Sequence, residues 1–153
     1  MNAYSQYQQN QILSASPEKI LLMLYDGAIR FNRQAMLGFE EDNLQAFHHG
    51  INKTVAIITE FSNTLDHEIG GEIAENLDAL YNFMVRELTL ANLHKDIDKL
   101  QVVDRLLVDL RSAWGEAIEL NRGQISVEKL MEQNQKFVGG VHAEPYKPIS
   151  IAR

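Results

Sequence analysis

Apolar residues recur every three or four positions along four long segments, and this spacing places them on one face of an α-helix. Helices are predicted at about 17–39, 42–66, 72–91 and 96–121. No segment alternates apolar and polar residues as a β-strand would. In the last helix the steps of three and four alternate strictly, which is a heptad seam; its members are Leu100, Val103, Leu107, Leu110, Trp114 and Ala117. The pattern predicts an all-α protein.

Capping and turn residues separate these helices. A serine followed by a proline is a typical helix start, and Ser16-Pro17 opens the first helix in this way. Gly70-Gly71 precedes the third helix, and Gly123 is expected to end the fourth in a left-handed conformation. A short fifth helix is expected at about 127–137.

Four long amphipathic helices with short connections predict an antiparallel four-helix bundle. The chain has 153 residues, which is the length of one domain. We therefore predict a single helical domain over 1–153, with the bundle at about 17–121. The tails 1–15 and 138–153 are expected to be mobile, since the first has no charge and the second has two glycines and two prolines.

Composition narrows the function classes. Acidic residues outnumber basic residues by 21 to 14, and the formal net charge of −7 argues against nucleic-acid binding, which needs a basic face. The absence of cysteine excludes disulfides and thiol chemistry and suits a reducing cytoplasm. The longest apolar run, Ile20–Leu24, is far shorter than the roughly 20 residues that span a membrane. No secretory signal is recognised, so we expect a cytoplasmic protein with no membrane insertion.

The motifs of common active sites are absent from the sequence. A di-iron site in a bundle needs a glutamate three residues before a histidine, and none of the five histidines has one. There is no phosphate-binding loop, no zinc-protease motif and no nucleophile elbow. We therefore expect no cofactor, no metal and no catalytic residue, and the chain is not predicted to be an enzyme.

One pair of histidines leaves a second hypothesis open. His48 and His49 lie on the predicted second helix, with Lys53 one turn after His49. A histidine phosphotransfer signalling bundle also exposes a histidine on a helix, often with a lysine one turn later. In this chain the spacing to the lysine and the position of Gly50 depart from that pattern. The pair is thus either a phosphotransfer site at His49 or two surface imidazoles.

The third and fourth helices contain more apolar residues than one buried stripe needs. Exposed apolar surface of this kind usually marks a binding site, and helices commonly dock in such grooves. Alternatively, the fifth helix or the N-terminal tail covers the surplus. The residues concerned are Tyr81, Phe83, Val85, Leu90, Val102, Leu106 and Val108.

Several short strings resemble one known family in order and spacing. They are Tyr7–Ile12 (YQQNQI), Ser14–Ile20 (SASPEKI), Met23–Ala28 (MLYDGA), Gly70–Leu77 (GGEIAENL), Leu80-Tyr81 and Ala91–Leu93. Together they are similar to the flagellin-specific export chaperones, the FliS family, whose tryptophan is expected where Trp114 stands. The resemblance covers about residues 4–121, and the tail 138–153 matches nothing in the family pattern.

The resemblance implies a cytoplasmic chaperone without enzymatic activity. Such a protein binds the C-terminal helical segment of newly made flagellin, prevents premature polymerisation and delivers the subunit to the flagellar type III export gate. A segment that is disordered before assembly can be held by an extended apolar contact. A homodimer formed through spare apolar faces is a further hypothesis.

The resemblance also suggests residues that contact the client. The family's N-terminal segment lies in the apolar groove when no client is bound, which gives Tyr7 and Ile12 a role as a displaceable plug or as client contacts. A groove wall is expected at Tyr81, Met84, Leu88 and Asn92, with Asn76 as a further polar contact. Met84 and Leu88 also fall on the core stripe and could be purely structural. Gly27 is expected to allow close helix packing.

Overall fold

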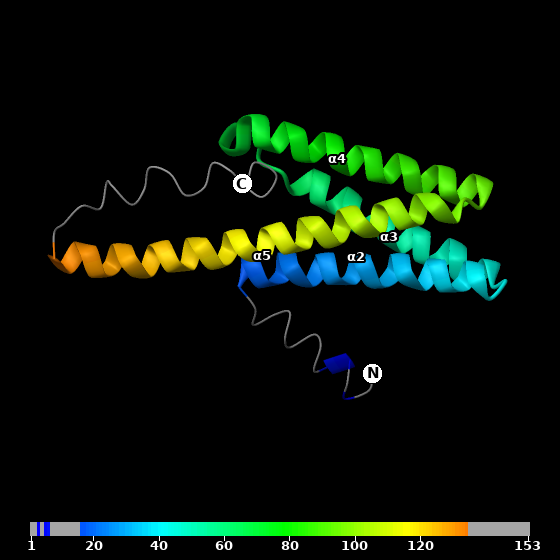
Figure 1. Cartoon of the computed structure of the whole chain (residues 1–153), viewed down its shortest axis with the longest axis horizontal. Helices are drawn as coiled ribbons and strands as arrows, with labels where there is room; N and C mark the ends of the chain where they lie inside the picture. Colours follow the sequence, from blue (N-terminus) through cyan, green and yellow to red (C-terminus); the bar gives the residue numbers. More distant parts are fainter. Residues whose placement is uncertain (1–2, 4, 7–15, 135–153) are drawn as a thin grey trace.

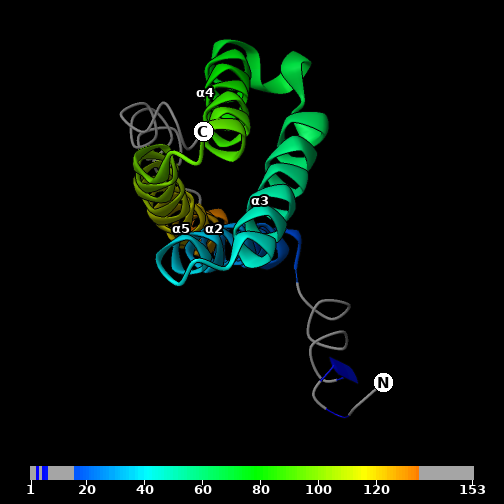
Figure 2. The ribbon, with the colours of Figure 1, turned by 90° about the vertical axis from the view of Figure 1, so that its right-hand side faces the viewer.

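The computed structural model describes residues 3, 5, 6 and 16–134. Its helices are α2 (Pro17–Glu40), α3 (Leu44–Thr64), α4 (His67–His94) and α5 (Ile97–Asn134). Consecutive helices run in opposite directions along the long axis of the bundle (Figure 1). Seen end on, α2 lies between α3 and α5, and α4 closes the ring opposite α2 (Figure 2). The prediction of an all-α, antiparallel four-helix bundle is confirmed.

Three of these helices begin after a polar N-cap residue. Ser16 caps α2, its hydroxyl accepting a hydrogen bond from the Lys19 amide at 3.2 Å, with Pro17 in the first turn. Asn43 caps α3 in the same way, and Asp66 caps α4 by accepting from the Ile69 amide. Each cap satisfies an amide that has no partner within its helix. The start predicted at Ser16-Pro17 is therefore confirmed.

Two predicted helix boundaries are wrong, the start of α4 and the end of α5. Helix α4 begins at His67 rather than at Glu72, and its first turn is joined to the rest through Gly71, which has a non-helical φ of 51°. Helix α5 does not end near Asn121 but runs through Gly123 to Asn134, past the ends of the other helices (Figure 1). A glycine inside a helix costs only about 1 kcal/mol relative to alanine, which good helix formers on both sides can offset.

The short fifth helix predicted at 127–137 is thus a continuation of α5 as far as Asn134, and its last three positions lie outside the described residues. The predicted tails 1–15 and 138–153 also lie outside them, apart from positions 3, 5 and 6.

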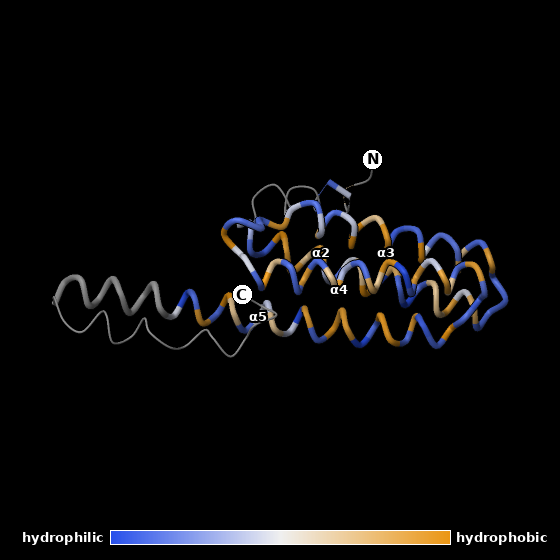
Figure 3. The backbone as a smooth tube through the Cα atoms, turned by 90° about the horizontal axis from the view of Figure 1, so that it is seen from above, coloured by the Kyte–Doolittle hydropathy of each residue, from blue (hydrophilic) through white to orange (hydrophobic). Residues whose placement is uncertain are grey.

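The core is a single stripe from each helix. Apolar positions recur along each described helix with polar positions between them (Figure 3). The heptad seam of α5 is buried except at Trp114, which is half-buried. The other large, fully buried apolar side chains are Tyr25, Phe47, Ile51, Ile58, Tyr81, Met84 and Leu88.

Two glycines allow α2 and α3 to pack closely, but Gly27 is not one of them. A Cβ atom on Gly50 would lie 2.6 Å from the Phe31 carbonyl oxygen, and one on Gly38 would lie 2.7 Å from the Phe47 nitrogen. At Gly27 the nearest atom, Ile57 Cδ1, would be 3.6 Å away, which is ordinary contact. The close approach predicted at Gly27 is therefore found at Gly38 and Gly50.

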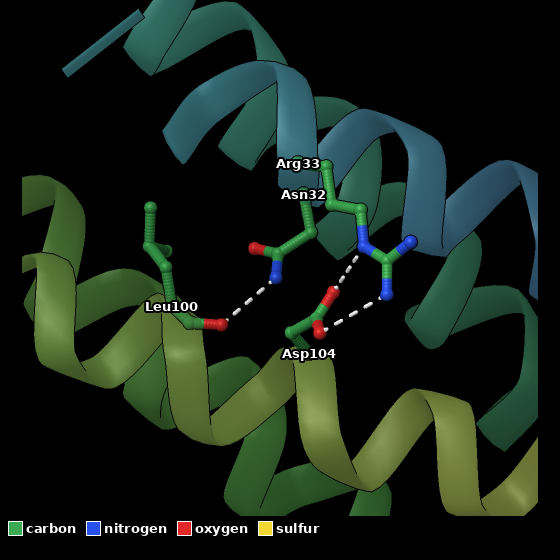
Figure 4. A network of polar contacts seen from close by, with 4 residues as sticks. All are labelled: Asn32, Arg33, Leu100 and Asp104. Carbon is green, nitrogen blue, oxygen red and sulfur yellow. Dashed lines mark hydrogen bonds and ion pairs between the residues drawn. The ribbon is translucent and has the colours of Figure 1, made fainter. Parts of the chain in front are cut away.

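Polar groups join α2 to α5 (Figure 4). The fully buried Asn32 donates from Nδ2 to the Leu100 carbonyl oxygen at 2.9 Å. Beside it, Arg33 donates to both carboxylate oxygens of Asp104. Arg111 binds Asp26 in the same bidentate manner. An exposed ion pair adds at most about 1 kcal/mol, so the two ion pairs act mainly by fixing how the helices are aligned.

Within the described part of the chain, none of the helices has a stretch long and apolar enough to cross a membrane.

Candidate functional site

A cavity of about 380 Å³ lies where the start of α2, the end of α3 and the first turns of α4 meet, and Trp114 of α5 completes its wall. We call it the Trp114 cavity. Its lining is mostly apolar, which is typical of binding sites in proteins. The lining residues are Pro17, Leu21, Phe61, Thr64, Leu65, Asp66, Ile69, Gly70, Ile73, Ala74, Leu77, Tyr81 and Trp114.

Four aromatic residues pack together at this cavity: Phe61, Tyr81 and Trp114 belong to its wall, and Tyr25 is fully buried behind them. Tyr25 stacks on Phe61 with ring centroids 4.3 Å apart, and Phe61 contacts Tyr81 at 5.5 Å. The hydroxyl oxygens of Tyr25 and Tyr81 are 2.6 Å apart, and the indole nitrogen of Trp114 donates to Tyr25 at 3.2 Å. Aromatic contacts of this type stabilise the folded state by more than the burial of their apolar area alone. The cluster therefore gives the cavity a rigid base.

Both tyrosine hydroxyls keep their protons. Burial is the main cause that raises the pKa of Tyr25 and of Tyr81 above the ordinary value, because a phenolate is poorly solvated inside the protein. The pair is thus neutral at any physiological pH, and it presents hydroxyl groups rather than a charge.

The first turn of α4 forms part of the rim of the cavity. Asp66, Ile69 and Gly70 line the cavity on one side of Gly71, and Ile73 and Ala74 line it on the other. Gly71 has φ 51° and ψ −126°, a conformation that is essentially reserved for glycine. This residue therefore sets the angle at which the rim meets the rest of α4.

We expect Gly71→Ala to destabilise the chain by about 1–3 kcal/mol, because alanine is strained at this backbone conformation. No atom lies within 4 Å of an added Cβ, so the effect would come from the backbone alone. Thermal unfolding followed by circular dichroism measures it. Gly123→Ala is the matched control, since Gly123 lies in a helix and is equally open; it should be neutral or stabilising. Equal stability of the two variants would contradict the prediction.

The structure brings few of the predicted client contacts to this cavity. Tyr81 lines it, with 2% of its surface exposed. Met84 and Leu88 do not form a groove wall, because both are fully buried in the core. Asn76 is exposed on α4 and does not line the cavity. Tyr7 and Ile12 lie outside the described residues.

Asn92 lies near the other end of α4, where it joins α4 to α3. It hydrogen-bonds His48 through Oδ1 and donates to Asn52 from Nδ2 at 3.4 Å. These contacts give it a role in the packing of the two helices. His49, the neighbour of His48 in sequence, is exposed, and its ring centroid lies 6.4 Å from that of Phe31 in an edge-to-face arrangement. Nothing in the described surroundings of His49 favours the phosphotransfer hypothesis.

Apart from Tyr81, which is buried, the surplus apolar residues of α4 and α5 are half-buried rather than openly exposed. Phe83, Val85 and Leu106 pack against the core from its margin. The end of α5 does not cover them, since it runs away from the bundle (Figure 1). None of these three residues lines the Trp114 cavity.

Sequence reasoning missed most of the cavity wall. Periodicity assigns Phe61 to no site, Leu65 lies in the two-residue connection between α3 and α4, and Ile69 lies in the first turn of α4. The available signal was Ile69, a large apolar residue beside a helix cap, which is 85% exposed. Because Ile69 both lines the cavity and is exposed, its side chain is available to a bound segment.

Two further hollows are less suited to hold an apolar segment. One, of about 330 Å³ between α2 and α5, is lined by several charged residues, among which Arg111 is already paired with Asp26. The other, of about 360 Å³ between α2 and α3, is flanked by Lys53 and Glu60. The walls of the Trp114 cavity come from all four helices.

Comparison with known proteins points to one family. A family model described as flagellar protein FliS matches residues 1–121. A flagellar secretion chaperone FliS of Campylobacter jejuni is 38% identical over 114 residues, covering 74% of this chain and 89% of its own length. The corresponding protein of Bacillus subtilis is 36% identical, and the match covers 79% of this chain and 90% of that protein. The one of Salmonella typhimurium is 37% identical, and the match covers 74% of this chain and 86% of that protein.

Proposed function

Because the chain belongs to the FliS family of flagellar proteins, we propose that it is a cytoplasmic export chaperone for flagellin. In this proposal it binds the C-terminal helical segment of flagellin, prevents premature polymerisation and supports delivery to the flagellar type III export gate. No enzymatic step is part of this function, and the curated relatives are named as secretion chaperones.

The observation that carries the proposal is the Trp114 cavity. Its apolar lining and its aromatic base can bury the apolar face of a helical segment. A client segment that is disordered when free must be ordered on binding, and this loss of entropy is offset by the apolar area that it buries. A preformed cavity lowers the total entropic cost of binding, since the chaperone itself needs little ordering.

The N-terminal segment is proposed to occupy the same cavity when no client is present. Pro17 lines the cavity, so the N-terminal segment joins the described chain beside it. Tyr7 is ten residues from Pro17, and an extended chain of that length reaches about 33 Å. Tyr7 and Ile12 are thus within reach of the apolar lining and would be displaced by the client.

Truncation of Ile69 tests the client site. We expect Ile69→Ser to weaken binding of a C-terminal flagellin peptide roughly 10- to 100-fold, because burying an isoleucine side chain contributes about 1.5–3 kcal/mol. Ile69 is 85% exposed, so its loss should leave the folded chain intact. Trp114 is the sole tryptophan and lines the cavity. Its fluorescence, with a peptide that lacks tryptophan, reports the titration.

Leu37→Ser is the matched control. Leu37 is also an exposed apolar residue of a helix, but it lies at the other end of α2 and does not line the cavity. It should change the dissociation constant by less than about twofold. No binding by the parent chain at micromolar concentration would disprove the proposed function. Equal losses in both variants would disprove the location of the site. Light scattering on the same samples determines whether the free chain is a homodimer.

A further inference from the structure

The hydroxyl pair at the base of the Trp114 cavity has one hydrogen more than its own contacts use. Tyr25 and Tyr81 each have one hydroxyl hydrogen, and a single hydrogen fills the 2.6 Å gap between their oxygens. The indole N–H of Trp114 donates to the Tyr25 oxygen. Since an indole N–H can only donate, Trp114 cannot accept either hydroxyl hydrogen. One of the two hydroxyl hydrogens must therefore find an acceptor elsewhere.

The position of that hydrogen follows from burial. If Tyr81 donated to Tyr25, the Tyr25 hydrogen would need another acceptor, and none is found for it among the described residues. Tyr25 is fully buried and does not line the cavity, and a buried donor without a partner is strongly unfavourable. If Tyr25 donates to Tyr81 instead, the free hydrogen is on Tyr81, which lines the cavity.

The resulting chain of hydrogen bonds runs in one direction. The Trp114 indole donates to Tyr25. With Tyr25 donating to Tyr81, the Tyr81 hydrogen is left for an acceptor in the cavity that Tyr81 lines. Each bond in such a chain polarises the next one. The rest of the aromatic base, Phe61, has no polar group. The cavity thus combines mostly apolar walls with one hydroxyl donor, that of Tyr81.

We propose that the Tyr81 hydroxyl is a specificity-determining hydrogen-bond donor for the client, and that the segment bound in the Trp114 cavity presents an oxygen acceptor to it among apolar side chains. This inference rests on the proposed function. The acceptor is a carbonyl or hydroxyl oxygen, from either the backbone or a side chain of the client. A segment with apolar residues alone would leave the Tyr81 hydrogen without a partner once water is expelled, and would be rejected.

The test compares Tyr81→Phe with Tyr25→Phe in the full chain. Each variant removes one oxygen from the same hydroxyl pair, but only Tyr81→Phe removes the donor that faces the cavity. Calorimetric titration with a C-terminal flagellin peptide should show roughly tenfold weaker binding for Tyr81→Phe. Tyr25→Phe should stay within about twofold of the parent chain. If both variants bind as the parent does, the inference is wrong although the proposed function stands. If the parent chain fails to bind, the proposed function itself is wrong.

Peptide variants identify the source of the acceptor. Each Ser, Thr, Asn and Gln of the peptide is replaced in turn by a residue of similar size without the oxygen. A side-chain acceptor is identified by a replacement that weakens binding to the parent chain but not to Tyr81→Phe. A loss in Tyr81→Phe that couples to no side chain identifies a backbone carbonyl.

A measurement on the unmodified chain covers the case in which Tyr81→Phe does not fold. Exchange of the Tyr81 hydroxyl proton with water is followed by nuclear magnetic resonance, with and without saturating peptide. The peptide should slow this exchange, because its acceptor replaces water as the partner of the hydroxyl. Exchange that is unchanged or faster in the complex would overturn the inference.

Discussion

Gly50→Ala is expected to destabilise the chain by about 3 kcal/mol, which corresponds to a fall of roughly 10 °C in melting temperature. The added methyl group would lie 2.6 Å from the Phe31 carbonyl oxygen and 2.7 Å from the Ala35 nitrogen. Both are backbone atoms inside α2, which cannot move without the helix. The two helices must therefore separate along their whole contact, and the core side chains between them lose packing. Thermal and urea unfolding followed by circular dichroism measure the change.

The same substitution at Gly27 is the matched control and should have the opposite sign. Gly27 is also buried within α2, but an added methyl group would meet Ile57 Cδ1 at a comfortable 3.6 Å. Alanine is a better helix former than glycine by about 1 kcal/mol, so Gly27→Ala should be neutral or stabilising. Similar losses at both positions would contradict the prediction, because they could not come from the close backbone contact that Gly50 makes and Gly27 does not.

Asn32→Asp is expected to destabilise the chain by about 3–5 kcal/mol at neutral pH, since it places an unpaired charge in the core. Asn32 is fully buried and donates to the Leu100 carbonyl oxygen, which a carboxylate would repel. Its Oδ1 has no hydrogen-bond partner within the described chain. The nearby Arg33 is held by Asp104 (Figure 4). Unfolding in urea at pH 7 measures the loss.

The loss should shrink in acid. Burial would raise the pKa of Asp at this position above its unfolded value of about 3.9. A group with a raised folded-state pKa favours folding below the unfolded pKa, and this stability is lost as the pH rises through the folded pKa. The difference from the parent chain should thus be smallest near pH 4, where a protonated carboxyl can donate to Leu100.

Asn32→Leu separates charge from packing. It removes the amide at similar volume, and the Leu100 carbonyl keeps its bond within α5. Its effect should be below about 1.5 kcal/mol and should not depend on pH. If the loss in Asn32→Asp is equally insensitive to pH, it comes from packing and not from the charge.

The helices could be predicted from the sequence because each contributes one stripe to one core. The seam residues Leu100, Val103, Leu107 and Leu110 are buried as the heptad spacing requires. Trp114 belongs to the same seam but is half-buried, because at that level the seam faces the cavity. The same regular pattern thus predicts the core well and hides the one position where the core opens.

The errors came from features that periodicity does not contain. Met84 and Leu88 have the same spacing as Tyr81, yet Tyr81 lines the cavity and the other two do not. Which of them meets a cavity depends on where the neighbouring helices end. Gly27 and Gly50 are likewise both glycines in helices, and only the approach of a second backbone distinguishes them. Gly123 does not end its helix, because a helical glycine is a weak breaker.

The contacts between α2 and α5 join residues that are far apart in the sequence, and this affects the order of folding. The helices α2 and α3 are joined by a connection of three residues, so their pairing requires little loop closure. By contrast, Asn32 bonds Leu100 across 68 positions and Trp114 bonds Tyr25 across 89. Contacts of such long range form late and slow the rate of folding. The Trp114 cavity has no complete wall until α5 docks. A partly folded chain therefore lacks the site that we propose for the client, and only the completed bundle offers it.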